Sequence, residues 1–268
     1  MEYIFGFNVF VKPIEEFFEY VSRTGLEHME IDLIAEHSYL ETFTQERITN
    51  LKNLADEFQI NLSLHTPYSI NPSDRIEKIR NANITYLKGC VSLAEQLNAT
   101  HITTHIGYYI GLQSSTERRL EALERLVLTL QEVIQRCEEN NIKLALENVN
   151  ALSEFSELSL LGDNMNDFAF LYSKINSPLL KMCLDTGHAN ITEGVVVYIE
   201  NFKDKIINMH FHDNMGEHDQ HLNVGDGTTP WKEVWSAIKR IQYKGPFLSE
   251  CFHSEPHEAK EALLKYLE

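Results

Sequence analysis

Short apolar runs alternate with amphipathic segments along the whole of this chain. The apolar runs are typical of strands, and they lie at residues 3–10, 28–34, 60–65, 101–106, 142–147, 179–185, 205–211 and 246–251. A segment with helical periodicity follows each of them, at residues 13–23, 44–58, 74–97, 116–140, 165–174, 195–202, 231–241 and 256–267. Ser73 is placed to cap the helix that begins at Asp74.

This order predicts an α/β protein built from eight strand–helix units. Near-continuous apolar strands are typical of a parallel sheet that is covered on both faces. Because no linker, low-complexity tract or composition break interrupts the units, they predict one (β/α)8 TIM barrel domain over residues 1–268. A doubly wound open sheet is the alternative. Neither GxGxxG nor GxxxxGK[ST] follows a strand, so we expect no nucleotide cofactor.

Side chains that bind metals stand where the predicted strands end. Glu147, Asp185, His210 and Glu250, called the quartet below, come from the fifth to eighth strands in order. In a barrel, the carboxyl ends of all strands meet at one face, so we expect the quartet to share one pocket. A buried carboxylate is costly unless it is paired or binds a metal. Three carboxylates and an imidazole suit Mn²⁺, Mg²⁺, Co²⁺ or Zn²⁺, and the alternative is a set of helix caps and salt bridges.

Further histidines extend this pattern. His65 and His105 end the third and fourth strands, and Tyr68 follows closely enough to present its hydroxyl or ring to the site. His188 lies three residues after Asp185, and Gly187 between them permits a tight turn that brings both side chains over the barrel mouth. We expect His188 to bind either the metal or a substrate oxygen.

The segment 210–227 is the most unusual in the chain, because it combines histidines and aspartates in a loop. Asp219 and His221 form a D-x-H pair whose side chains can point the same way and bind one ion; a solvated polar loop is the alternative. His212 shares a strand face with His210 and is expected to contact the substrate or to support a ligand. Glu30 either reaches the centre or is an interior polar group, and His101 is expected to be structural.

Composition narrows the function classes. The formal net charge of −17 disfavours nucleic acid and anionic membranes as partners, although bound divalent ions would add local positive charge. The four cysteines are scattered, which indicates reduced thiols in a cytoplasmic protein. No stretch resembles a signal peptide or a membrane span. A GxSxG elbow is absent, so serine catalysis has little basis. The sequence shows no interface signature, and a homo-oligomer stays possible.

Several of these motifs together resemble the xylose-isomerase-like TIM barrel superfamily. They are LHTPY, HITTHIG, LENVN, LDTGHANI, MHFHDN, DQHLNVGDGTTPW and PFLSE, and the resemblance extends over nearly the whole chain from Tyr3. That superfamily contains sugar and sugar-phosphate isomerases and epimerases, dehydratases and endonuclease IV. The motifs are specific for the superfamily and much less so for one activity.

Resemblance to the sugar epimerases implies one divalent metal on the quartet. Glu147 and Glu250 would then flank a carbohydrate substrate, one removing a proton next to the carbonyl and the other returning it. The metal would stabilise the enediolate. His65, Tyr68, His188 and His212 would contact the substrate, with His188 holding a substrate oxygen.

Resemblance to endonuclease IV implies up to three zinc ions that cleave abasic-site DNA. Its nine ligand positions all carry a suitable residue here, at His65, His105, Glu147, Asp185, His188, His210, Asp219, His221 and Glu250. Three departures favour the isomerase or epimerase: the segment after Glu147 lacks the glycine-rich pattern, the loop between His210 and His221 is short and lacks basic residues, and GDGTTPW is similar to sugar-isomerase relatives. A metal-dependent dehydratase of the dehydroshikimate type is the third reading, and a non-catalytic barrel the last.

Overall fold

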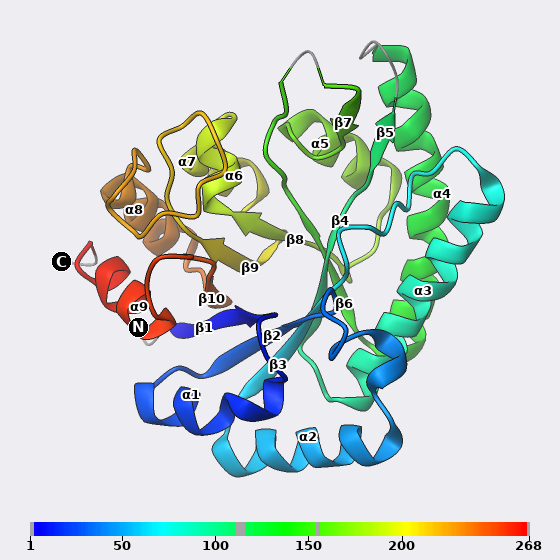
Figure 1. Cartoon of the computed structure of the whole chain (residues 1–268). Helices are drawn as coiled ribbons and strands as arrows, with labels where there is room; N and C mark the ends of the chain where they lie inside the picture. The colour runs from blue at the N-terminus through cyan, green and yellow to red at the C-terminus, as the bar shows by residue number, and fades with distance from the viewer. Residues whose placement is uncertain (1–2, 111–115, 154–155, 267–268) are drawn as a thin grey trace.

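The computed structural model describes residues 3–110, 116–153 and 156–266. Within them, eight parallel strands close into a barrel in the order β1-β10-β9-β8-β6-β4-β3-β2 (Figure 1). The predicted (β/α)8 barrel is confirmed, and the open-sheet alternative is wrong because β1 pairs with both β2 and β10. The barrel strands are β1 (Ile4–Val9), β2 (His28–Asp32), β3 (Asn61–His65), β4 (His101–His105), β6 (Lys143–Glu147), β8 (Leu180–Asp185), β9 (Ile206–Phe211) and β10 (Pro246–Ser249).

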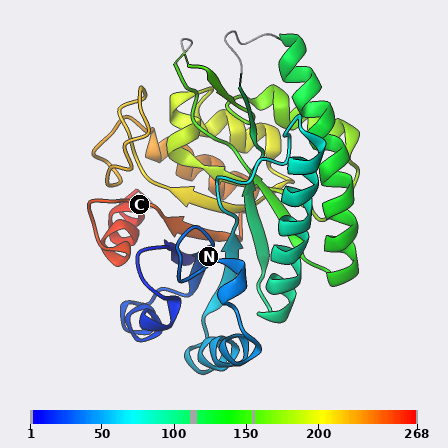
Figure 2. The ribbon, with the colours of Figure 1, turned by 45° about the vertical axis from the view of Figure 1, so that its right-hand side comes forward.

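Helices surround the barrel, and the two long ones α3 and α4 pack side by side (Figures 1 and 2). The apolar faces of the surrounding helices cover the sheet. The largest side chains between helices and sheet, such as Trp235, Tyr198 and Phe168, are fully buried. The helices are α1 (Phe18–Thr24), α2 (Gln45–Phe58), α3 (Glu77–Gln96), α4 (Thr116–Asn140), α5 (Met165–Lys174), α6 (Thr186–Ile191), α7 (Val195–Phe202), α8 (Trp231–Ile241) and α9 (Pro256–Leu264), with 3₁₀ turns η1 (Ile14–Glu16) and η2 (Leu40–Thr42).

One expected helix cap is wrong. Helix α3 begins at Glu77 and not at Asp74, and no side chain caps its first residue. The hydroxyl of Ser73 instead lies 2.8 Å from Oδ1 of Asn71 and 3.1 Å from the carbonyl oxygen of Tyr108, and its one proton is shared between these acceptors. Ser73 therefore ties the β3–α3 loop to the segment after β4, which is a tertiary role that helical periodicity does not reveal.

A small antiparallel ribbon, which the periodicity did not indicate, stands at the mouth of the barrel. Strands β5 (Tyr108–Ile110) and β7 (Leu158–Leu160) pair with each other and project beyond the barrel strands near α5 (Figure 1). Arg119 on α4 forms ion pairs with Asp163 and Asp167, which holds the start of α5 against α4 beside this ribbon. The ribbon adds an apolar wall above the carboxyl ends of the strands.

None of the helices within residues 3–110, 116–153 and 156–266 has the length and apolar character that a membrane crossing requires.

Candidate metal centre

The register of the barrel strands brings the quartet together. Asp185 at the end of β8 lies opposite His210 on β9, and Glu147 at the end of β6 lies opposite Cys183. Alternate residues of a strand face the same side, so all of these side chains turn into the barrel. In the described chain, ligand atoms of Asp185, His210 and Glu250 lie within 4.8 Å of one another, as do those of His65, Glu147 and His210. Glu147, Asp185 and His210 are buried and Glu250 is partly buried, all at or directly after the strand ends where the sequence predicted them.

Both glutamates of the quartet meet at one nitrogen. Nδ1 of His210 lies 3.1 Å from Oε1 of Glu147 and 3.0 Å from Oε1 of Glu250. Asn8 on β1 donates a further hydrogen bond to Oε1 of Glu250 over 3.1 Å. Burial on its own lowers the pKa of His210, but the acidic groups around the ring raise it well above its ordinary value. Nδ1 of His210 thus lies between the two carboxylates, at the point where a cation would bind.

Glu147 has a second set of partners on the side of β3 and β4. Its Oε2 lies 2.7 Å from Nε2 of His65 and 3.2 Å from Nε2 of His105. Burial lowers the pKa of His65, but the charge of Glu147 and the hydrogen bond to it outweigh burial and raise this pKa to about 10. Glu147 thus joins the histidines of the third and fourth strands to the centre.

The DTGH segment is helical rather than a tight turn. Oδ1 of Asp185 accepts a hydrogen bond from the backbone N–H of His188 over 2.6 Å and so caps α6. Gly187 has ordinary helical geometry, and its role is spatial: a Cβ at this position would overlap the ring of His212. Oδ2 of Asp185 is buried and has no hydrogen-bond partner among the described residues, which leaves it free to bind an ion.

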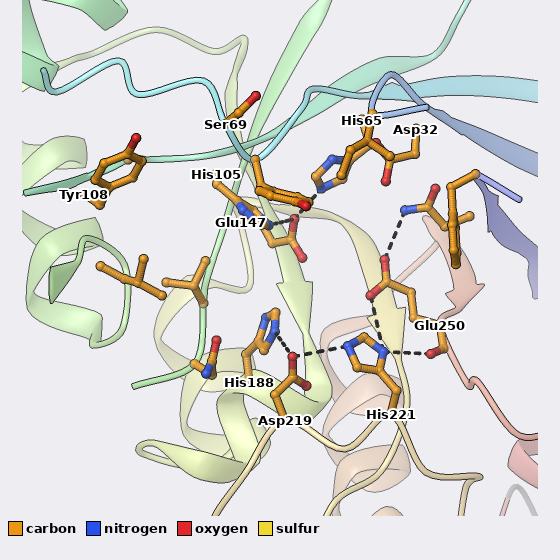
Figure 3. Close-up of a pocket in the computed structure, with 18 of the residues that line it drawn as sticks. Asp32, His65, Ser69, His105, Tyr108, Glu147, His188, Asp219, His221 and Glu250 are labelled. Atoms are coloured by element: carbon orange, nitrogen blue, oxygen red, sulfur yellow. Dashed lines mark hydrogen bonds and ion pairs between the residues drawn. The ribbon is translucent and has the colours of Figure 1, made fainter. Parts of the chain in front are cut away.

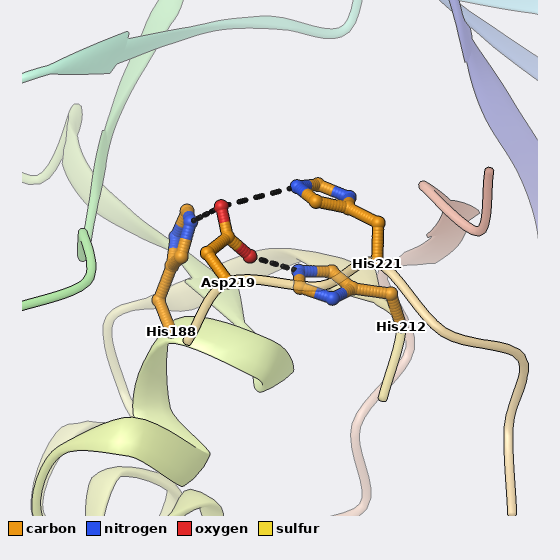
Figure 4. A group of neighbouring side chains, drawn as sticks. All are labelled: His188, His212, Asp219 and His221. Carbon is orange, nitrogen blue, oxygen red and sulfur yellow. Dashed lines mark hydrogen bonds and ion pairs between the residues drawn. The ribbon is translucent and has the colours of Figure 1, made fainter. Parts of the chain in front are cut away.

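Four side chains form an outer cluster beside the quartet, namely His188, His212, Asp219 and His221 (Figure 4). Oδ2 of Asp219 lies 3.3 Å from Nε2 of His188 and 3.2 Å from Nε2 of His221. Burial raises the pKa of Asp219, but its hydrogen bonds with the two histidines outweigh burial and lower it. Burial lowers the pKa values of His188 and His221, and their carboxylate partners raise them to about 10 and about 9. The side chains of the D-x-H pair are therefore only partly exposed and face the other members of the cluster, and their binding of an ion stays a prediction.

His212 is the most deeply buried member of the outer cluster and does not line the cavity. Its ring is fully buried and stacks on that of His221, with 3.9 Å between ring centroids. Its Nε2 is 3.1 Å from Oδ1 of Asp185. Of the two roles expected for His212, support of neighbouring site residues matches this position, whereas direct substrate contact does not.

Two supporting residues escaped sequence reasoning. The side chain of Asn148 accepts from the backbone N–H of Asp185 over 2.8 Å and donates to the carbonyl of Asp185 over 3.0 Å. Asp213 accepts from the indole of Trp231 over 2.9 Å and from three backbone N–H groups, and so anchors the loop that carries Asp219. Each directly follows a strand-end ligand motif, and that proximity was the available signal.

Two members of the quartet, Glu147 and Glu250, line a cavity of about 740 Å³ at the barrel mouth (Figure 3). The walls are largely apolar, from Phe10, Ile34, Ile110, Leu158, Leu160 and Phe252. Tyr68 lies at the rim with 63% of its surface exposed. Its expected contact with substrate stays a prediction.

Asp32, at the end of β2, also lines the cavity and was not singled out from the sequence. It lies opposite His65 in the strand register. Burial raises the pKa of its carboxyl group to about 7, against the charge of His65. Its Oδ1 is buried and without a hydrogen-bond partner in the part of the chain that the structure describes. Its signal was positional, since it stands two residues after Glu30 on the inward face of the same strand.

The orientation of the histidines fits a bound divalent cation. In His65, His188 and His221, Nδ1 faces a backbone carbonyl at 2.8, 2.9 and 2.7 Å, those of Thr66, Asn148 and Glu250. A carbonyl only accepts, so Nδ1 carries the proton and Nε2 points at the carboxylates. Ligating histidines in proteins are held in this manner. Together with the unpartnered Asp185 oxygen, this arrangement matches the donor set that Mn²⁺, Co²⁺ or Zn²⁺ prefers.

A family model described as "Xylose isomerase-like TIM barrel" matches residues 18–268. The chain belongs to this family. The predicted resemblance is thus confirmed over nearly the whole barrel. In TIM barrels the active site lies at the carboxyl ends of the strands, and the candidate site of this chain lies at the same position.

Curated relatives of this family member include both predicted classes. An uncharacterised protein, MJ1311, from Methanocaldococcus jannaschii is 27% identical over 89% of this chain and 84% of its own length. Fructoselysine 3-epimerase from Shigella flexneri is 25% identical over 95% of this chain and 92% of its own. Probable endonuclease 4 from Mycoplasmopsis pulmonis is 26% identical over 66% of this chain and 63% of its own.

Solved structures show the same fold. A D-tagatose 3-epimerase-like protein superposes with a TM-score of 0.87 at 26% identity, covering 98% of this chain and 97% of the other. The IOLI protein, solved with a bound zinc atom, superposes with a TM-score of 0.78 at 19% identity, covering 98% and 95%; at this identity it shows the fold alone. These similarities support a sugar isomerase or epimerase, and the ligand clusters suggest a divalent metal.

Proposed function

We propose that this protein is a divalent-metal-dependent epimerase or isomerase of an unphosphorylated ketose. The observation that carries the proposal is the meeting of Glu147 and Glu250 at Nδ1 of His210, on the floor of a cavity large enough for a sugar. Two carboxylates on either side of one point can remove a proton from one face of a carbon and supply a proton to the other.

The chemistry requires an acidic C–H bond next to a carbonyl. A divalent ion bound by the quartet would polarise that carbonyl and so lower the pKa of the neighbouring C–H group. One glutamate takes the proton, and the electron pair moves into the carbonyl to give an enediolate. The second glutamate, in its acid form, delivers a proton to the opposite face of the same carbon, or to the adjacent carbon while the proton of the neighbouring hydroxyl passes to the former carbonyl oxygen. Protonation of the opposite face gives an epimer, and protonation of the adjacent carbon gives an isomer.

Other residues hold the sugar in place. His188 lies at the cavity wall with Nε2 beside Asp219, and we expect it to bind a substrate oxygen. Asp32 offers its unpartnered Oδ1 to a substrate hydroxyl from the opposite strand end. The apolar side chains of Phe10 and Phe252 form part of the outer wall, where the C–H surface of a sugar can pack.

The charge of the cavity argues against a sugar phosphate. Asp32, Glu147, Asp219 and Glu250 line it (Figure 3), whereas no lysine or arginine does so among the described residues. A phosphate group adds a charge of about −1.5 to −2. Phosphate sites in proteins use Arg or Lys side chains or free helix N-termini. The cavity therefore favours a neutral substrate.

We expect the kcat/KM for a ketose to be at least about tenfold higher than the kcat/KM for its phosphate ester, because one unpaired charge contact costs more than about 1.4 kcal/mol.

We expect Asp32→Asn to raise the KM for the ketose by about 3- to 10-fold, which corresponds to the loss of one hydrogen bond, with little change in kcat. Steady-state assays on both substrates check this, with Asp56→Asn on the exposed side of α2 as the control. Preference for the phosphate ester would refute the charge argument.

Turnover itself is tested in D₂O. Proton transfer through an enediolate must place solvent deuterium on carbon in the product, and ¹H NMR of ketoses incubated with the metal-loaded protein detects it. We expect exchange at the carbon next to the carbonyl for at least one ketose. Absence of exchange across a panel that includes C2, C3 and C4 epimer pairs would remove the proposal.

The outer cluster favours one second candidate, a multinuclear phosphodiesterase similar to the endonuclease 4 relative. Its four ligand atoms lie within 4.8 Å of one another, as a further ion requires. Elemental analysis separates the two functions: we expect about one ion per chain, whereas about three would favour the phosphodiesterase. We also expect no cleavage of an abasic-site duplex. Cleavage that Asp219→Ala abolishes would make the phosphodiesterase the better assignment.

A further inference from the structure

The interior of the barrel directly below the quartet is polar. Barrels of this architecture are usually filled by branched apolar side chains. Here the inward positions one step below the strand ends include Glu30, Ser63, Thr103 and Asn208, and each of them is completely buried. A carboxylate in this position is costly unless several donors surround it. Such a group therefore needs a functional or structural reason.

Three donors converge on one oxygen of Glu30. Oε1 accepts hydrogen bonds from the hydroxyls of Ser63 and Thr103 over 3.0 and 2.9 Å, and from Nδ2 of Asn208 over 3.3 Å. His101 lies below, with Nε2 3.5 Å from the same oxygen. This arrangement fixes the orientation of the carboxylate. It also leaves the other oxygen, Oε2, for a single partner.

That partner is the histidine of the quartet. Oε2 of Glu30 lies 2.6 Å from Nε2 of His210. The opposite nitrogen of the ring, Nδ1, faces Glu147 and Glu250. The ring of His210 therefore stands between the buried carboxylate below and the two glutamates of the site above.

His210 is turned the opposite way from the other site histidines. In His65, His188 and His221, Nδ1 is held outside by a neutral backbone carbonyl and Nε2 points inward. In His210, Nε2 is held outside and Nδ1 points inward, and the holding group is a carboxylate. A charged acceptor polarises an imidazole more strongly than a carbonyl does, which makes the inward nitrogen a stronger electron donor.

We infer that Glu30 is a positioning residue of the metal centre, which keeps the proton of His210 on Nε2 and presents Nδ1 to the ion. The inference rests on the proposed metal centre, but not on the identity of the substrate. It assigns the polar layer of Ser63, Thr103 and Asn208 to the support of Glu30. A purely structural role for Glu30 would instead affect folding stability and leave ion binding unchanged.

Glu30→Gln separates these two roles, because it keeps the shape of the side chain, removes its negative charge and replaces one acceptor oxygen by a donor NH₂ group. The amide NH₂ must face either His210 or Asn208. In the first case it opposes the Nε2–H group and favours the tautomer with the proton on Nδ1, where it blocks the ion. In the second case it opposes the donor Nδ2 of Asn208. In both cases the tautomer that leaves the lone pair of Nδ1 available to the ion is less strongly favoured.

The test uses Co²⁺ titration of metal-free protein, followed by visible absorption and by chelator competition. We expect Glu30→Gln to weaken Co²⁺ binding on the order of 10- to 100-fold and to alter the Co²⁺ spectrum. The control is Asp167→Asn, which changes a buried, ion-paired carboxylate on α5; it should lower the melting temperature and leave the affinity unchanged. Equal affinity of Glu30→Gln and wild type would overturn the inference, and so would a wild-type protein that binds no Co²⁺.

A second measurement needs no variant at this position, so it stands even when Glu30→Gln does not fold. ¹⁵N NMR of the zinc-loaded wild type should show that the proton of His210 is on Nε2. The ¹H resonance of this proton should be shifted strongly downfield by its hydrogen bond to the carboxylate. A proton on Nδ1 would overturn the inference. Ketose exchange is assayed separately: failure of exchange with intact Co²⁺ binding speaks against the epimerase and not against Glu30.

Discussion

Glu147→Gln is expected to abolish deuterium exchange into the ketose. An amide cannot accept a proton from carbon, and a positioned general base contributes on the order of 10²- to 10⁴-fold to a rate. The loss should appear in kcat, because the apolar walls that bind the sugar are unchanged. Since Glu147 contacts His65, His105 and His210, the variant is also expected to bind its ion more weakly, so rates are measured at saturating metal.

Two comparisons make this result specific. Glu250→Gln should have a loss of similar size, because it removes the other member of the acid–base pair. Glu139→Gln, on the exposed face of α4, should retain full activity. Exchange within about tenfold of wild type in Glu147→Gln at saturating metal would show that the proton passes through another group.

The second large effect is expected on removal and return of the ion. A ligand at about 1,000 times its Kd stabilises the folded state by about 4 kcal/mol, which corresponds to a rise in Tm of about 10 °C for a chain of this size. Chelator-treated protein should therefore melt about 10 °C lower than protein with excess Mn²⁺ or Zn²⁺, and it should be inactive. Differential scanning calorimetry with and without chelator measures this. Identical melting curves would mean that the quartet is held by ion pairs alone.

The pH dependence follows from the site histidines. In the ion-free protein the pKa values of His65 and His188 are raised to about 10 and that of His221 to about 9. A histidine whose pKa is higher in the folded than in the unfolded protein raises the free energy of unfolding. This contribution is full below the unfolded-state pKa of about 6.5, and it is lost as the pH rises through the folded-state pKa of about 9 to 10. Ion binding must displace protons, so apparent affinity should rise about tenfold per pH unit for each proton released. Melting and titration series from pH 6 to 10 check both signs.

The fold was predictable because one simple pattern repeats. Each strand is apolar enough to be buried on both faces, and each helix has one apolar side. The position of the candidate site was predictable for a related reason. Side chains such as Glu147 and Asp185 end apolar runs, and a barrel brings these strand ends together. The D-x-H pair of Asp219 and His221 lies on a loop that no periodicity describes, and the concentration of histidines and aspartates in that loop indicated it.

What escaped prediction depends on contacts between distant segments. The sequence indicates a turn residue at Gly187, but the ring of His212, which directly follows β9, leaves no room for a Cβ there. Ser73 was interpreted as a cap, but its hydroxyl bonds to the segment after β4. Asp32 was not singled out from the sequence. It lies opposite His65 in the strand register and lines the cavity.

Anomalous diffraction from crystals grown with Mn²⁺ or Zn²⁺ tests the central claim most directly. The account predicts a strong peak bounded by oxygens of Glu147, Asp185 and Glu250 and by Nδ1 of His210, at about 2.0–2.3 Å from each. Density for an ion only at the surface, with the carboxylates still paired to protonated histidines, would contradict it.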